Sequence, residues 1–312
     1  MYKYILKRIG ISLVTIWLLI TITFFLIHII PGEPFSNVKK LPPQVLENLN
    51  RYYGLDKPLF IQYFKYLGNI IKGDLGYSLV YKNRTVNDII GQAFPYSAQL
   101  GIQSLIVGTV LGLTLGVLAG LHHNRALDYT IMVIAVLGIS IPNFIIGGLL
   151  QYYFGVKYRI FPVAQWKGFI YTILPTIALG ARVLASQVRM IRVSTLEVLG
   201  KDYIKTAKAK GIGRMAIIFR HILPNSILPV ITTLGPLTAT ILTGTFVIEN
   251  IFAIPGLGRY FIQGVQDLDY PVALGTTLFF GIFLVGLNFL VDLLYFFIDP
   301  RISRENITGD RL

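Results

Sequence analysis

The sequence predicts an all-α polytopic membrane protein with six transmembrane helices. Of its 312 residues, 54% are apolar and only 14% are charged, and the mean hydropathy is +0.64. A soluble domain carries about 25% charged residues, so this chain cannot form two or three soluble domains. The long apolar runs show no polar–apolar alternation, which favours helices over the strands of a membrane barrel. Disulfide-stabilised and collagenous folds are excluded, because the chain has no Cys and no Gly-X-Y repeat.

Six apolar runs are each long enough to cross about 30 Å of hydrocarbon as a helix. They comprise residues 9–30, 98–121, 129–154, 171–190, 227–248 and 272–298. The fourth run is the weakest, because Arg182 and Arg189 interrupt it and Pro175 lies near its start. The first run is longer than the core of a secretory signal and lacks a small-residue cleavage site, so we interpret it as a retained anchor.

Six spans place both termini on one side of the membrane. If that side is the cytoplasm, the short cytoplasmic segments hold 16 Lys and Arg residues when Arg182 and Arg189 of the fourth run are counted with them, and the short outer loops hold 4. Short cytoplasmic loops are enriched in Lys and Arg, whereas a segment as long as 31–97 scarcely affects orientation. We therefore expect both termini to be cytoplasmic. Lys- and Arg-rich cytoplasmic loops also account for the net charge of +13. We therefore expect the basic segments to contact membrane lipid, and we expect no nucleic acid as a partner.

This topology divides the chain into four parts. Residues 1–30 hold the cytoplasmic start and the first transmembrane helix, 31–97 form an extracytoplasmic segment, 98–298 form the core with helices 2–6, and 299–312 form a cytoplasmic tail. The extracytoplasmic segment is expected to form a small cap between helices 1 and 2.

Two helices are expected in the cap, one from Pro43 through Tyr53 and one from Pro58 to Ile71. The second carries an apolar stripe at three- and four-residue spacing that we expect to pack the cap onto the membrane helices. The stripe consists of Leu59, Tyr63, Tyr66, Leu67 and Ile70.

The second span carries glycines at every fourth position, namely Gly108, Gly112, Gly116 and Gly120. On a helix these positions form one smooth stripe, which lets a neighbouring backbone approach closely. We interpret the stripe as structural packing, either within the chain or against a partner.

The cytoplasmic loop of residues 191–226 is predicted to form a two-helix elbow. Residues 203–210 are Ala-rich and helix-prone, and Gly211 and Gly213 break that helix. A second amphipathic turn follows, and Pro224 is expected to end it before the fifth span. Such an elbow could act as a rigid lever that transmits the movement of a docking partner to the spans on either side. The alternative interpretation of the segment is a basic surface loop that binds only anionic lipid.

The fifth span contains candidates for a pore or gate. Pro236 removes a backbone donor and should kink the helix. The hydroxyls of Thr240 and Thr243 either line a watery path or bond back to their own helix. Glu249, at the outer end of the span, is a rare membrane carboxylate of the kind that faces a cavity or a partner.

No enzyme site is indicated. The chain has no H-E-x-x-H motif and no Cys, so the usual zinc spacings are absent. Its one Gly-Lys pair, Gly200-Lys201, lacks the spacing of a phosphate-binding loop. We expect no catalytic, metal-binding or cofactor-binding residue in this chain, and if ATP drives transport, another subunit must bind it.

The loop resembles the coupling loop of ABC-importer permeases, whose pattern is Glu-Ala-Ala, three residues, Gly, nine residues, Ile-x-Leu-Pro. Lys205 and Thr206 depart from that pattern but look like the Tyr-x-Arg-Thr-Ala-x-Ala-Lys-Gly variant of the dipeptide, oligopeptide and nickel branch, and His221 stands at the Ile position. The positions that carry the resemblance are Tyr203, Lys205, Thr206, Ala207, Gly211, Leu223 and Pro224.

The resemblance extends over nearly the whole chain. The ordered set of further motifs resembles the first membrane subunit of the oligopeptide type. The set includes Gly73-Asp-Leu-Gly76, Ile141-Pro-Asn-Phe144, Pro255-Gly-Leu-Gly258, Asp269-Tyr-Pro271 and Asp299-Pro-Arg301.

The resemblance implies a type I ABC-importer permease of MetI-like architecture in a bacterial-type cytoplasmic (inner) membrane. It also implies the partners: a homologous second permease subunit, two ATPase subunits that hold ATP and Mg²⁺, and an extracytoplasmic substrate-binding protein. The implied function is ATP-driven import of oligopeptides, with the loop around residues 203–224 docking on an ATPase subunit. A nickel or dipeptide importer of the same family stays open as an alternative. So does an ion-coupled secondary transporter, although the sequence lacks the repeats of that class.

Overall fold

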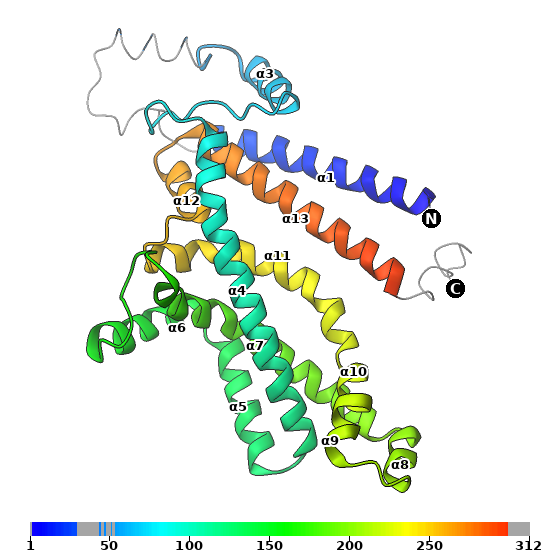
Figure 1. Ribbon diagram of the computed structural model, residues 1–312. Coiled ribbons are helices and arrows are strands. Elements are labelled where there is room, and N and C mark those ends of the chain that lie inside the picture. The colour runs from blue at the N-terminus through cyan, green and yellow to red at the C-terminus, as the bar shows by residue number, and fades with distance from the viewer. Residues whose placement is uncertain (1, 30–43, 45–46, 48–50, 52–53, 299–312) are drawn as a thin grey trace. The chain divides into compact units, whose positions relative to one another are not determined.

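The computed structural model describes residues 2–29, 44, 47, 51 and 54–298 (Figure 1). Within these residues the chain is helical and contains no β-strand; one isolated bridge joins Tyr77 and Thr85. Four helices are long and apolar enough to cross a membrane, and a bent pair supplies a fifth candidate span. The predicted all-helical membrane fold is confirmed, whereas the predicted total of six spans stays a prediction.

The long helices cover the predicted apolar runs with shifted ends. They are α1 (Tyr2–Ile29), α4 (Val86–Leu121), α7 (Phe169–Leu199), α11 (Leu228–Ile251) and α13 (Tyr270–Ile298). Helix α4 begins well before residue 98, because Thr85 and Asp88 cap it: the Asp88 amide donates to Thr85 Oγ1 (3.0 Å), and the Thr85 hydroxyl donates to the Asp88 carboxylate. Helix α7 continues past residue 190, so its two interrupting arginines lie inside a continuous helix.

The predicted third span, 129–154, is wrong as a single helix. The chain forms α5 (Ala126–Ser140), then α6 (Asn143–Leu150) and a π-helical turn η1 (Gln151–Lys157), and the second piece is bent by 106° from the first. The break falls at Ile141, which is extended (φ −89°, ψ 124°), and at Pro142. Proline lacks an amide donor and disfavours helical geometry in the residue before it, which accounts for the break.

The described residues fall into two compact units. Unit 1 comprises residues up to 96 together with those from 256 onward, and unit 2 comprises residues 97–255. Unit 1 contains α1, α3 (Leu59–Ile71), the start of α4, α12 (Leu257–Gln266) and α13. Unit 2 contains the remaining helices.

In unit 1, helix α3 packs on α1 and α13 through its apolar stripe. Tyr63 is buried with Phe24 of α1 and Leu274 of α13, and Tyr66 and Leu67 pack against the same cluster. The Tyr63 hydroxyl also lies 2.7 Å from Thr21 Oγ1 on α1. The predicted helix from Pro58 to Ile71 and its packing are therefore confirmed; the predicted helix over residues 43–53 lies mostly outside the described residues.

Asp269 joins the segment before α4 to the start of α13. Its carboxylate accepts hydrogen bonds from the Ser78 hydroxyl and from the amides of Leu79 (3.1 Å), Val80 (3.2 Å) and Val272 (3.4 Å). Burial raises the pKa of the Asp269 carboxyl above its usual value, and these donors act in the opposite direction. The carboxylate thus caps α13 and fixes the preceding loop with one side chain.

In unit 2, the glycine stripe of α4 packs against α7. Cβ atoms placed at these four glycines would lie 2.5 to 2.7 Å from side-chain atoms of α7, closer than real Cβ contacts allow. The glycines and their partners pair in order as Gly108 with Val183, Gly112 with Gln187, Gly116 with Ile191 and Gly120 with Thr195. Of the two predicted possibilities for the stripe, packing within the chain is confirmed.

The replacement of Gly112 by Ala should destabilise the protein, because the new Cβ would lie 2.5 Å from the Cβ of Gln187. Overpacking of this kind costs about 1–3 kcal/mol of unfolding free energy. Thermal unfolding of the purified protein in detergent measures the change. The matched control is Gly91→Ala in the same helix, where a Cβ meets nothing within 4 Å. Ala is favoured over Gly in a helix, so this control should not lose stability; equal losses in both variants would contradict the packing account.

Candidate functional site

The predicted elbow between α7 and α11 consists of short helical pieces (Figure 1). They are α8 (Asp202–Ala209), α9 (Arg214–Ile217), the π-helical turn η2 (Ile218–Ile222) and α10 (Leu223–Ser226). Helix α8 and the run from α9 to α10 are the two arms of the elbow. The predicted break between them is confirmed at residues 211–213.

Gly211 makes the turn between the two arms. Its φ is +75°, in the left-handed region that side-chain-bearing residues rarely adopt. Three amides then return to carbonyls of α8: Lys210 N to Thr206 O (3.0 Å), Gly211 N to Lys208 O (3.0 Å) and Ile212 N to Ala207 O (3.2 Å). A glycine is therefore required here because it closes the end of α8 and redirects the chain.

The elbow has a small apolar core of its own. Ile204 and Ala207 of α8 are buried against Ile217 and Ile222 of the second arm and against Val198 near the end of α7. These contacts hold the two arms together as one piece and attach that piece to a long helix. A loop that merely coats a lipid surface needs no such core.

The outward face of the elbow carries large apolar side chains. Tyr203 is 44% exposed, Met215 64% and Phe219 59%. Lys205 and Thr206 are also exposed, and both are held locally, since Lys205 Nζ lies 2.9 Å from the Asp202 carboxylate and the Thr206 hydroxyl donates to the Asp202 carbonyl. We call Tyr203, Met215 and Phe219 the elbow face.

The structure separates the predicted coupling residues into two groups. Tyr203, Lys205, Thr206, Gly211 and Pro224 are exposed, whereas Ala207 points into the core of the elbow and Leu223 is half-buried. The expectation that Pro224 ends the second arm is wrong, because α10 continues through it to Ser226. Pro224 lies inside the continuous helical run from Arg214 to Ser226, directly after the widened turn η2.

A buried ion pair holds the C-terminal half of α7 to α5. Arg192 donates from Nε to Asp128 Oδ1 (2.6 Å) and from Nη2 to Asp128 Oδ2 (2.8 Å), and the Asp128 side chain is only 1% exposed. The backbone N–H of Asn124 also donates to this carboxylate, at 3.1 Å from Asp128 Oδ2. The sequence does not reveal Arg192 as the partner of Asp128, although an acidic residue in the first turn of a membrane helix indicates that a partner exists.

The four pore candidates all lie on α11. The side chains of Pro236, Thr240 and Thr243 lie outside the described part of the chain. Glu249 is fully buried, and its Oε1 accepts a hydrogen bond from the Ser97 hydroxyl of α4 (2.6 Å). Glu249 therefore ties the end of α11 to α4 within unit 2.

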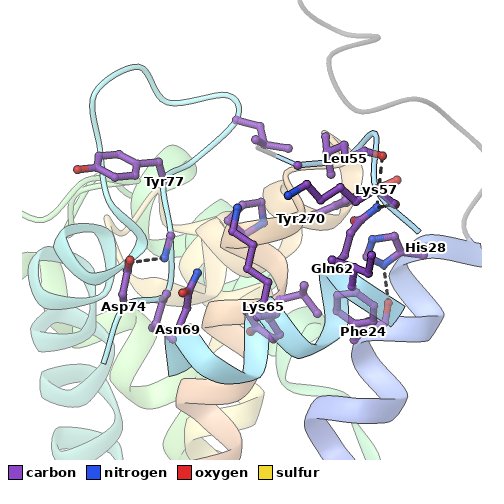
Figure 2. Close-up of a pocket in the computed structure, with 18 residues that line it drawn as sticks. Phe24, His28, Leu55, Lys57, Gln62, Lys65, Asn69, Asp74, Tyr77 and Tyr270 are labelled. Carbon is purple, nitrogen blue, oxygen red and sulfur yellow. Dashed lines mark hydrogen bonds between the residues drawn. The ribbon is translucent and has the colours of Figure 1, made fainter. Parts of the chain in front are cut away.

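Unit 1 contains a separate cavity of about 270 Å³ (Figure 2). Lys57 and Lys65 line it, together with Tyr66 and with His28 of α1. His28 uses Nδ1 to bond the Phe24 carbonyl (2.7 Å), and neither its Nε2 nor the Tyr66 hydroxyl has a hydrogen-bond partner among the described residues. Burial raises the pKa of the Tyr66 hydroxyl. The cavity thus combines ammonium groups with apolar and aromatic walls.

Comparison with known proteins connects this geometry to membrane transport. The family described as binding-protein-dependent transport system inner membrane component matches residues 112–304, and its N-terminal counterpart matches residues 1–101. A dipeptide transport system permease protein of Bacillus subtilis is 47% identical over 97% of this chain and 98% of its own length. The dipeptide permease of Lactococcus lactis is 43% identical (97% and 99%), and an oligopeptide transport system permease protein of Haemophilus influenzae is 41% identical (97% and 99%).

Among solved structures, the fold is similar to the crystal structure of an amino acid ABC transporter with histidines. The TM-score is 0.53 at 14% identity, and the match covers 67% of this chain and 93% of that one. At this identity the likeness concerns the fold alone.

Replacement of Asp128 by Ala should strongly destabilise unit 2, because the Arg192 guanidinium would lose its carboxylate in a largely buried position. Removing one partner of a buried ion pair costs about 3–5 kcal/mol. The double variant Asp128→Ala/Arg192→Met should recover part of this loss, which chemical unfolding in detergent would measure. The exposed pair of Lys205 and Asp202 serves as the control, and Lys205→Ala should leave stability nearly unchanged. A double variant as unstable as the single one would exclude the ion pair as the cause.

Proposed function

Because the chain belongs to the family of binding-protein-dependent transport inner membrane components, we propose that it is the permease subunit of an ATP-driven peptide importer. In this proposal the chain forms half of a translocation channel, and a homologous second permease forms the other half. Two ATPase subunits bind ATP and Mg²⁺ on the cytoplasmic side, and an extracytoplasmic binding protein delivers the cargo. The chain itself performs no chemistry on that cargo.

The structure of the elbow is the main support for this proposal. It has its own buried core, it exposes three large apolar side chains, and it continues directly into α7 and α11. An exposed apolar face on a small rigid element is typical of a protein-binding surface. We assign the elbow face, with Lys205, Thr206, Gly211 and the turn at Pro224, to docking on an ATPase subunit.

The buried Ala207 has a different role in this proposal. Because it is 5% exposed and packs in the core of the elbow, it acts through the shape of the elbow and not through contact with the ATPase. A large side chain at this position would separate the two arms.

The membrane topology follows from this assignment. We propose six transmembrane helices, with α11 among them and with α5 and α6 together forming one broken span. The elbow and both termini are then cytoplasmic, and the segment 31–97 with α3 forms an extracytoplasmic cap. The distribution of Lys and Arg in the short loops supports this orientation.

We place the pore or gate along α11. Pro236, Thr240 and Thr243 follow Pro229 in the sequence at intervals of 7, 4 and 3 residues, which is the spacing of one helix face. Glu249 fixes the end of α11 through Ser97, so it would act on the gate by holding the helix in position.

The cargo proposed here is a peptide, because the relatives are named as dipeptide and oligopeptide permeases. Peptide length stays open, since the more similar relatives above carry the dipeptide name while the sequence motifs resemble the oligopeptide type. Uptake of labelled dipeptides, pentapeptides and ⁶³Ni²⁺ into proteoliposomes that hold the full assembly decides between these cargoes and the nickel alternative. Uptake driven by an ion gradient without ATP would overturn the proposal in favour of a secondary transporter.

The double variant Met215→Ser/Phe219→Ser should weaken association with the ATPase subunits by about tenfold or more, because buried aromatic and Met anchors dominate such interfaces. Co-purification of the ATPase with this chain, followed by peptide-stimulated ATP hydrolysis, measures the effect. Thermal stability should change little, since both side chains are exposed.

The matched control is Ile160→Ser, an equally exposed apolar residue in the loop before α7. It should retain full ATPase association. Normal ATPase binding by the Met215/Phe219 variant would show that the elbow face is not the docking surface.

A further inference from the structure

Helix α7 carries two arginines inside the segment that is long and apolar enough to cross a membrane (Phe169–Leu199). Arg182 and Arg189 are seven residues apart, so they lie on the same face of the helix, two turns from each other. Ser186 lies between them on that face. A charged side chain within a span normally faces a partner or a water-filled cavity.

The depth of these arginines follows from the ion pair of α7 with α5. Arg192 pairs with Asp128 in the first turn of α5, next to the turn between α4 and α5. Arg182 lies ten residues before Arg192, which is about 15 Å along a helix. Since the hydrocarbon layer is about 30 Å thick, Arg182 lies near its middle if the ion pair lies at the cytoplasmic boundary.

The face with the two arginines is uncovered, whereas two other faces of α7 are packed against α4 and α5. Gln187 and Ile191 contact the glycine stripe of α4, and Ala185 and Val188 pack against α5. Arg182 and Arg189 are both exposed, and neither forms an ion pair with any residue that the structure describes. The two guanidinium groups therefore lack a neutralising partner in unit 2.

A cavity of about 470 Å³ lies along this face, between α7 and the start of α11. Its walls are mixed, with a guanidinium, hydroxyls and a carboxylate among apolar side chains. The residues that line it are Ser186, Arg189, Met190, Val193, Ser194, Glu197 and Pro229. Glu197 lies eight residues from Arg189, about 12 Å along the helix, and forms no ion pair with it.

We propose that the Arg182–Arg189 face of α7 is a wet wall of the translocation path and binds the carboxylate groups of the peptide cargo. Lipid does not solvate a guanidinium, so two exposed arginines in a span favour a watery surface on that side. Guanidinium is also the side-chain group best matched to a carboxylate, through paired N–H donors. Every unmodified peptide has at least one carboxylate, at its C-terminus. This inference rests on the proposed peptide transport and adds a chemical basis for cargo contact.

The first test asks whether the face is wet and cationic, and it needs no transported peptide. Because the chain has no Cys, a single Ser186→Cys variant provides one reactive thiol in this subunit. In proteoliposomes that hold the full assembly, we measure the rates at which an anionic and a cationic methanethiosulfonate modify this thiol. Each rate is divided by the rate of the same reagent with the exposed loop variant Ile160→Cys. We expect Ser186→Cys to favour the anionic reagent by about tenfold, and Arg189→Gln added to it should abolish this preference.

The matched control is Ile177→Cys, on another face of α7 that is also exposed. It should react slowly with both reagents, as a lipid-facing thiol does. If Ser186→Cys reacts as slowly as Ile177→Cys, the face is dry and the inference is wrong, while the proposed peptide transport is unaffected.

The second test measures uptake of one peptide with a free C-terminus and of the same peptide with a C-terminal amide. The ratio of the two rates in Arg182→Gln and Arg189→Gln is divided by the ratio in the unmodified importer, so any preference of the binding protein cancels. We expect the relative preference for the free acid to fall by about tenfold, and Arg159→Gln in the loop before α7 should leave it unchanged.

The outcomes distinguish failure of the carboxylate site from failure of the proposed function. No ATP-dependent uptake of either peptide by the unmodified importer would contradict the proposed function itself. Normal uptake with an unchanged acid-to-amide ratio in both arginine variants would overturn only the carboxylate site. Loss of the second permease from the purified complex in these variants would instead identify the partner of the arginines as an acidic residue of that subunit, and would also overturn the inference.

Discussion

The close approach of α4 and α7 is the constraint on which the rest of unit 2 depends. Four glycines remove every side chain from the α4 side of the contact, so the backbones meet at a distance that no other residue allows. With α7 fixed in this way, α5 and α11 pack on two further sides of it, and the face with Arg182 and Arg189 stays exposed. Arg192 then reaches Asp128, and the end of α7 holds the elbow through Val198.

Much of this architecture could be predicted from the sequence because its signals are local. Apolar runs predicted the long helices, and glycine spacing predicted the close contact. Gly211 predicted the turn in the elbow, and the helix from Pro58 was recognised from its proline and its apolar stripe. These features depend on residues within a few turns of each other, which is the range over which a sequence pattern carries information.

The remaining features depend on residues far apart in the chain. The partner of Asp128 lies 64 residues away, and Ser78 lies 191 residues from Asp269. The break at Pro142 was missed because an apolar run gives no sign of a bend, although the proline itself was visible. Similarly, the alternation of exposed and buried positions in the elbow depends on its own core, so sequence alone could not distinguish Ala207 from its exposed neighbours.

The continuity of α7 has a mechanical consequence. After Pro175 the helix runs without interruption from Thr176 to Leu199, which is 24 residues, or about 36 Å. An unbroken rod of this length amplifies a small rotation at one end: a tilt of about 5° displaces the other end by about 3 Å, close to the width of a water molecule. If nucleotide-dependent force is applied at the elbow, a rotation too small to disturb the local packing would therefore be enough to admit or exclude solvent deep in the membrane.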